Sequence, residues 1–157
     1  MIDADTFRSV LGRFASGVTI VTTRDADGID HGMTVSAFCS LSLDPPMVVF
    51  CVDHIASMHD MLLAHPPCGM SILSSNQEAY SRRFADQDNE RFDGIAYSRG
   101  ESGVVLLDNA LAHLECRLVA HHEGGDHTVF IAQVDRAEPR HGRPLLYYRG
   151  GYAQLER

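Results

Sequence analysis

Short apolar runs and alternating apolar and polar residues recur along the chain and predict a protein built mainly from β-strands. The predicted strands cover residues 18–23, 33–43, 47–52, 68–73, 110–120 and 128–134. Turn-forming residues, such as the segment DADGIDHG, separate some of these strands. Strands that recur in this way, with short helical insertions, indicate a small antiparallel β-barrel.

Three helical patterns interrupt the strands. Residues 7–14 carry apolar side chains at helical spacing, and Asp5 is the predicted N-cap. A second pattern covers about residues 55–64 and stops at a pair of prolines. The third begins at Ser75 as the predicted N-cap, with Glu78 in the capping-box position. All three patterns are typical of surface helices that pack on another layer.

One face of the strand predicted over 33–43 is polar but carries no charge. Alternation places on this face Thr34, Ser36, Phe38, Ser40 and Ser42. Small hydroxyl groups can bond to a ligand and still allow its close approach, although β-propensity alone would also favour Ser and Thr on an exposed strand. The strand over 110–120 differs, because its polar face, with His113, Glu115 and Arg117, is typical of a face that meets solvent.

Composition restricts the class of protein. The chain has 157 residues, 45% of them hydrophobic, which favours one compact domain. Its formal net charge of -8 argues against nucleic-acid binding, which needs a surplus of Lys and Arg. No apolar run approaches the roughly 18 residues needed to span a bilayer, and the four cysteines form no C-x-x-C pair. We therefore expect a cytoplasmic protein with reduced thiols.

Local cationic and helix-start features are candidates for binding an anion. Asp53 and His54 join a strand to the second helix, where free backbone N–H groups and the Ser57 hydroxyl could bind an anionic group. Asp53 could equally be a simple helix cap. Arg82 and Arg83 are either a solvated helix end or a phosphate clamp, and two further arginines, Arg143 and Arg149, are cationic candidates.

The segment GGDHTVFIAQV, residues 124–134, places a carboxylate and an imidazole directly before an apolar strand. Two glycines precede Asp126 and His127, so the backbone there is free to make a tight turn. Such a turn presents both side chains at the end of a strand.

Five motifs, taken in order, resemble the short-chain flavin reductase family, the small NAD(P)H:flavin oxidoreductases that serve two-component flavin monooxygenases. The motifs are GMTVSAFCSLSLDPP, CVDHIAS, RRFA, GDHTVFIAQV and PLLYYRGGY, and the match runs from Phe7 to Leu155. The resemblance implies a mainly β protein, an FMN-binding split β-barrel of antiparallel Greek-key type, with residues 1–157 forming a single flavin reductase-like domain. It also implies a homodimer with flavin near the subunit interface.

The resemblance implies a set of cofactor-binding positions. The isoalloxazine and ribityl chain would be lined by Thr34, Val35, Ser36, Ser40 and Leu41. The phosphate region would be contacted by Cys51, Val52, His54, Ser57, Arg83 and Phe84. His127 would face the nicotinamide of NADH or NADPH, in a pocket also shaped by Tyr147, Tyr148, Arg149, Gly150 and Tyr152. The cofactors carry out hydride transfer, so no protein nucleophile is needed.

The chain departs from the family pattern at three positions. His59 stands where a second hydroxyl is common, which bears on FMN against FAD preference. Ala132 replaces a common glycine, and Val104 stands where proline is frequent. The choice between NADH and NADPH is left open, as is the identity of the partner monooxygenase.

Two alternatives belong to other classes. A metal enzyme could use His121, His122, Asp126 and His127 as ligands. However, adjacent residues of a strand point to opposite faces, so His121 and His122 cannot easily join one site. A flavin- or haem-binding split-barrel protein without enzyme activity is the second alternative, and it would not require the nicotinamide pocket.

Overall fold

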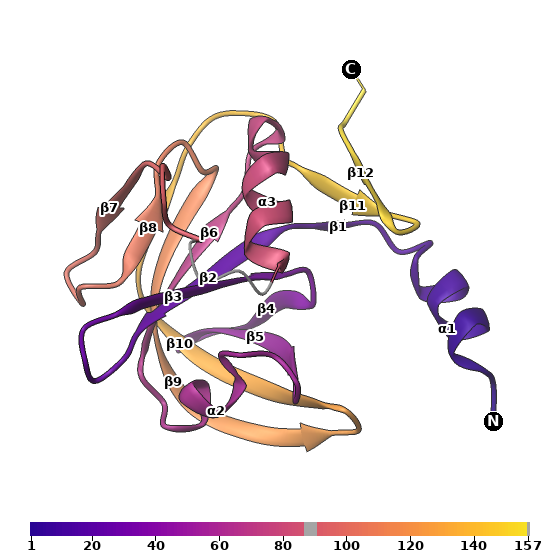
Figure 1. Cartoon of the computed structure of the whole chain (residues 1–157), viewed down its shortest axis with the longest axis horizontal. Helices are drawn as coiled ribbons and strands as arrows, with labels where there is room; N and C mark the ends of the chain where they lie inside the picture. The colour runs from indigo at the N-terminus through magenta and orange to yellow at the C-terminus, as the bar shows by residue number, and fades with distance from the viewer. Residues whose placement is uncertain (87–90, 157) are drawn as a thin grey trace.

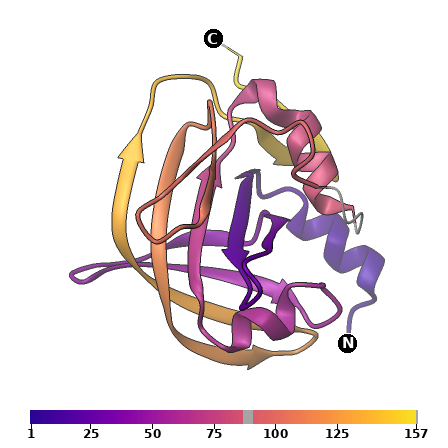
Figure 2. The ribbon, with the colours of Figure 1, turned by 60° about the vertical axis from the view of Figure 1, so that its left-hand side comes forward.

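The computed structural model describes residues 1–86 and 91–156 and contains one large antiparallel sheet of seven strands. In spatial order the strands are β3 (Asp30–Val35), β2 (Thr19–Arg24), β6 (Pro67–Ile72), β9 (Ala112–Gly124), β10 (His127–Pro139), β5 (Pro46–Asp53) and β4 (Phe38–Leu43). The sheet curls around a central core (Figures 1 and 2). The mainly β barrel predicted from the sequence is confirmed.

Smaller elements lie outside the barrel, and the N-terminal helix extends away from it without a buried residue (Figure 1). They are the hairpin β7 (Tyr97–Arg99) and β8 (Val105–Leu107), the sheet of β1 (Ser16–Gly17), β11 (Leu146–Tyr148) and β12 (Gly151–Ala153), the helices α1 (Ala4–Leu11), α2 (His59–Leu63) and α3 (Glu78–Ala85), and the 3₁₀-helix η1 (Ser75–Gln77). None of the helices in the described part of the chain is long and apolar enough to cross a membrane.

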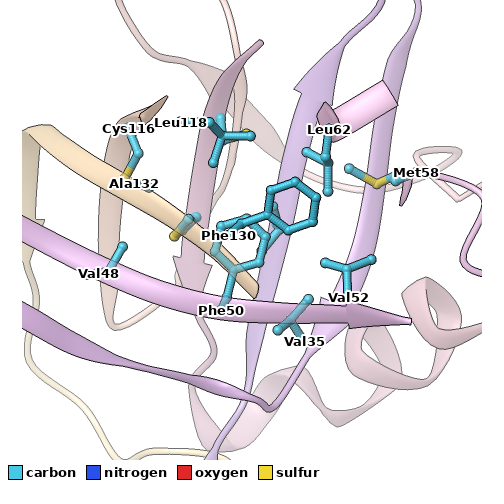
Figure 3. Packing of buried hydrophobic residues seen from close by; sticks show 13 residues of the cluster. Val35, Val48, Phe50, Val52, Met58, Leu62, Cys116, Leu118, Phe130 and Ala132 are labelled. Atoms are coloured by element: carbon cyan, nitrogen blue, oxygen red, sulfur yellow. The ribbon is translucent and has the colours of Figure 1, made fainter. Parts of the chain in front are cut away.

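The core of the barrel consists of apolar side chains from the inner faces of the strands together with α2. Phe50 of β5 and Phe130 of β10 stack at its centre, with ring centroids 5.5 Å apart (Figure 3). Met58 and Leu62 close the same cluster beside Val52. A second cluster, which includes Phe84, lies between α3 and the outside of the sheet. Burial in these two clusters explains why the apolar runs of the sequence form strands.

The helices begin at other residues than predicted. The N-cap of the first is Asp3, whose carboxylate accepts a bond from the Thr6 N–H at 2.7 Å. The second helix covers only His59–Leu63, because residues 54–58 form turns instead. The third is preceded by a 3₁₀ turn whose capping box joins Ser74 to Gln77, one residue before the predicted pair. Ser and Gln satisfy the box as well as Ser and Glu, so the sequence pattern fits either register.

The strand predicted over 33–43 is two strands. β3 ends at Val35 and β4 starts at Phe38, so the alternation does not continue across residues 36 and 37. A β-bulge at Ser40–Ser42 shifts the register again. Val35 and Phe38 both pack on the barrel core, whereas Leu43 is exposed. The single polar face predicted for this segment was therefore wrong.

The predicted solvent face of β9 is largely buried. The exposed fractions of His113 and Glu115 are only 5% and 8%. His113 Nε2 lies 2.6 Å from the Leu107 carbonyl oxygen of β8, and the Glu115 carboxylate accepts bonds from Ser102 N–H at 2.9 Å and Ser102 O–H at 2.7 Å. The β7–β8 hairpin and its turn cover this face, which local alternation could not reveal.

Candidate active site

A cleft lies between α3, the end of β3, the turn after β5 and the C-terminal hairpin. It consists of two adjoining pockets of about 200 and 240 Å³, which share Thr34 and Ala85. The first pocket is further lined by Val18, Ser36, Ser81, Tyr147 and Tyr152. The second is further lined by Met33, Asp53, Ile55, Ala56, Ser57, Phe84 and Arg91. Hydroxyl groups, apolar side chains and one guanidinium thus share a single concave surface.

Hydrogen bonds to α3 fix the walls of the first pocket. Thr34 donates its hydroxyl to the Ser81 carbonyl oxygen at 2.6 Å. The Ser81 and Tyr152 hydroxyls lie 2.7 Å apart, and the Arg82 guanidinium lies 4.8 Å from the centre of the Tyr152 ring. The helix and the C-terminal hairpin are therefore joined at the cleft, with Ser81 completely buried between them.

The C-terminal hairpin reverses through two residues with positive φ. Arg149 and Gly150 have φ angles of 52° and 76°, as a tight two-residue hairpin turn requires. Tyr147 pairs with Ser16 of β1, and the Arg149 N–H donates to the Gly12 carbonyl oxygen at 2.9 Å. These backbone contacts place the Tyr147 ring beside the first pocket, 5.6 Å from the Tyr152 ring centre.

The geometry of the turn between β9 and β10 explains why two glycines precede Asp126 and His127. Gly125 has a φ of 71° and is the first residue of a two-residue loop, where a positive φ is needed. His127 pairs with Asp53 of β5, and Asp53 lines the second pocket. The turn therefore lies beside the strand end that borders the cleft.

Electrostatics link the two side chains of this turn. His127 Nδ1 lies 2.7 Å from the Asp126 carboxylate, and this bond, followed by the charges of His127 and His54, lowers the pKa of Asp126. With Nδ1 engaged in this way, Nε2 is the ring atom of His127 that can face a ligand.

The predicted cofactor-binding residues fall into three groups. Those that line the pockets are Thr34, Ser36, Ser57, Phe84, Tyr147 and Tyr152. Val35 and Val52 point into the barrel core and could contact a ligand only through their backbone. Outside both pockets lie Ser40, Leu41, Cys51, His54, Arg83, Tyr148, Arg149, Gly150 and His127. The cofactor contacts of all three groups remain predictions.

Several residues that line the cleft were not predicted. Ser81 and Ala85 lie within or beside the RRFA motif, and their i, i+4 spacing on a helix could have identified them. Arg91 supplies the guanidinium of the second pocket and also donates to the Gly32 carbonyl oxygen. The neighbouring Arg83, predicted for this role, donates instead to the Asp93 carbonyl oxygen. Nothing in the local sequence distinguishes these two arginines.

The other reactive groups do not form a site of their own. Burial raises the pKa of Cys68 and of Cys116 to about 12, so both remain protonated thiols. His121, one of the proposed metal ligands, instead lies with its Nδ1 2.8 Å from His65 Nε2. Among the residues that the structure describes, no three His, Cys, Asp or Glu side chains are grouped so that they could hold a metal ion.

The antiparallel barrel defines a small β-barrel protein with a cleft that offers hydroxyl groups, apolar side chains and one guanidinium to a ligand. Residues 11–156 match the model of the family described as the flavin reductase like domain, and the chain belongs to this family. The motif resemblance found in the sequence is thereby confirmed.

Similar proteins match this chain over most of their length, and one solved structure has the same fold. An NADH-dependent flavin reductase from a Rhodococcus species is 43% identical over 95% of this chain and 85% of its own. The reductase subunit HsaB of a flavin-dependent monooxygenase from Rhodococcus jostii is 38% identical over 99% of this chain and 80% of its own. The NADH:FAD oxidoreductase SgcE6 of Streptomyces globisporus, solved in complex with NAD and FAD fragments, has a TM-score of 0.91 and 37% identity, covering 99% of this chain and 96% of that one.

Proposed function

We propose that this protein is an NAD(P)H-dependent flavin reductase that passes a hydride from reduced nicotinamide to FMN or FAD. The main structural support for this proposal is the cleft of two adjoining pockets, because the turn that bears His127 lies beside one wall of this cleft. The relatives named as NADH-dependent flavin reductases support the same activity.

The residues of the cleft fit a flavin. A flat ring system needs an apolar wall, which Val18 and Tyr147 provide in the first pocket. A polyhydroxyl chain needs small donors and acceptors, and these are Thr34 and Ser36. A phosphate needs a cation, and Arg91 in the second pocket is a planar donor suited to it.

The chemistry that a bound flavin supplies is acceptance of the hydride from reduced nicotinamide. The protein binds and orients the two rings, since holding reactants in a productive geometry accounts for much of such a rate enhancement. In this proposal Ser57 binds the flavin side of the pair, and His127 binds and orients the nicotinamide.

The partner is a separate flavin-dependent monooxygenase, which receives the reduced flavin by diffusion or in a transient complex. Relatives named as reductase subunits or components of monooxygenases support this proposal. The four free cysteines suit the reducing conditions of the cytoplasm, which is the proposed location.

A second copy of the chain is the proposed partner of α1. This helix has no buried residue, and the exposed fractions of its Phe7, Val10 and Leu11 are 53%, 60% and 51%. Phe14, which follows the helix, is 82% exposed. Apolar side chains on one face of a helix gain free energy when a partner covers them, and a homodimer would do so. Light scattering coupled to size exclusion tests this, with Phe14→Ser expected to give monomers and the adjacent Arg13→Ser expected to leave the dimer intact.

The activity is tested by steady-state oxidation of NADH, then NADPH, with and without added FMN, FAD or riboflavin. The expected result is turnover that requires added flavin and survives treatment with a metal chelator. The relative rates would then decide the nicotinamide and flavin preferences. Flavin binding without turnover for any pair would instead identify a flavin carrier and contradict the proposed function.

A further inference from the structure

The β9–β10 turn is attached to the end of β5 by a backbone bond. The His54 N–H donates to the Asp126 carbonyl oxygen at 3.0 Å, one residue beyond the Asp53–His127 pair. The turn extends past α2 at the lower end of the barrel (Figure 1). A hairpin end of this kind is free to bend unless side chains hold it.

A chain of polar side chains supports the base of the same turn. His54 Nε2 donates to the Glu123 carboxylate at 2.9 Å, and Thr128 Oγ1 lies 3.4 Å from the other oxygen of that carboxylate. Thr128 Oγ1 also lies 2.8 Å from His59 Nε2, and His59 Nδ1 donates to Asp60 at 2.9 Å. Glu123 and Thr128 stand on either side of the turn, so the chain joins both of its strands to α2.

Burial decides which contacts in this network constrain the turn. Glu123 and His54 have side chains that are 70% and 37% exposed, and an ion pair exposed to this extent contributes little alone. Thr128 is fully buried and His59 is only 7% exposed. A buried hydroxyl and imidazole must keep their partners, because an unsatisfied buried polar group is costly. The Thr128–His59 bond therefore fixes the strand directly next to His127.

We infer that Thr128, with Glu123, is a positioning residue that holds the β9–β10 turn so that His127 meets the nicotinamide ring. This inference rests on the proposed function. Neither residue lines the pockets of the cleft, so neither contacts the flavin there. Their effect is on the nicotinamide alone, transmitted through the turn.

The test compares Thr128→Val, Thr128→Ser and Glu123→Gln with the wild-type protein. Valine keeps the β-branched shape but removes the hydroxyl, whereas serine keeps the hydroxyl. Displacement of a binding group by a fraction of an ångström to 1 Å raises the KM for reduced nicotinamide about tenfold in Thr128→Val, with the flavin KM unchanged. Thr128→Ser restores the KM, and Glu123→Gln gives a smaller increase. The control Glu138→Gln alters an exposed glutamate at the far end of β10 and leaves the KM unchanged.

A double-mutant cycle distinguishes positioning from mere stability. Combined with His127→Ala, Thr128→Val adds less than about a twofold further increase in KM, because residues that act through one group are not additive. Full additivity would overturn the inference. So would a lowered melting temperature with an unchanged nicotinamide KM. A wild-type protein that binds flavin but oxidises no nicotinamide would overturn the proposed function as well, which separates the two failures.

Discussion

Gly32 on β3 lies directly against the Phe84 ring of α3. A Cβ added there would lie 2.8 Å from Cε1 of Phe84 and 3.1 Å from Cζ of Phe92. Real Cβ atoms essentially never come as close to another atom as the shorter distance. The Phe84 ring is 1% exposed, so it has no free space into which it can turn. The substitution Gly32→Ala must therefore push α3 away from the sheet.

The cost follows from overpacking. An extra methyl group in a well-packed core costs about 1–3 kcal/mol. For a chain of this size, each kcal/mol lowers the melting temperature by about 2–4 °C, so the expected decrease is roughly 2–12 °C. Since α3 carries Ser81 and Ala85 into the first pocket, the flavin dissociation constant rises in the same variant.

Gly17→Ala is the matched control, because nothing lies within 4 Å of a Cβ at Gly17. Thermal unfolding followed by circular dichroism, and flavin binding followed by fluorescence quenching, measure both variants under identical conditions. We expect Gly17→Ala to match the wild-type protein in both assays. If Gly32→Ala also matched it, the close packing of α3 against β3 would not control the cleft.

Three further predictions concern other parts of the molecule. His127→Ala raises the nicotinamide KM and leaves the binding of oxidised flavin unchanged, and Ser57→Ala does the reverse; steady-state kinetics with flavin titrations measures both, and equal losses for both ligands would contradict the roles. The hydrogen bond from Arg99 lowers the pKa of Asp30 below 3.8, so its stabilising effect is fully present above that pH and is lost as pH falls through the folded value. Asp30→Asn thus lowers stability by roughly 1 kcal/mol near pH 7, and denaturant titrations should show the difference vanishing in acid. His113→Leu leaves a buried carbonyl unpaired and costs about 1–3 kcal/mol in the same assay.

Strand positions were predictable from the sequence where the apolar side chains of a strand pack into the barrel core. The apolar runs over residues 47–52 and 128–134 became β5 and β10, and their inner residues Phe50 and Phe130 meet in the core. Local periodicity suffices here, because the barrel interior is the only place that these side chains can be buried. The extra length of β9 and β10 beyond the prediction comes from pairing across the turn, which is a property of two strands together.

Contacts between segments distant in the sequence explain why the face of β9 predicted to meet solvent is buried. Glu115 looks like a solvent-facing residue of an amphipathic strand, yet the turn at Gly100–Ser102 covers it. A Cβ at Gly100 would lie 2.2 Å from the Glu115 carboxylate, so a larger residue there would have to displace this carboxylate. No periodicity in residues 97–107 predicts that hairpin, and no pattern in β9 predicts that the hairpin packs on it. Alternation therefore predicts which residues share a face, but it does not predict what packs on that face.

In the candidate site too, the sequence predicted the segments involved but not which of their side chains line the cleft. Sequence motifs located most of its backbone, because Thr34, Ser57 and Tyr152 all fall within them and all line the cleft. A motif marks a stretch of chain, however, and successive residues of a strand point to opposite sides. Val35 thus lies in one of the motifs that resemble the family, while its side chain belongs to the barrel core. Which residues of a motif touch a ligand is decided by the elements opposite them, here α3 and the C-terminal hairpin, and the Ser81–Tyr152 bond that joins these two elements links residues 71 positions apart.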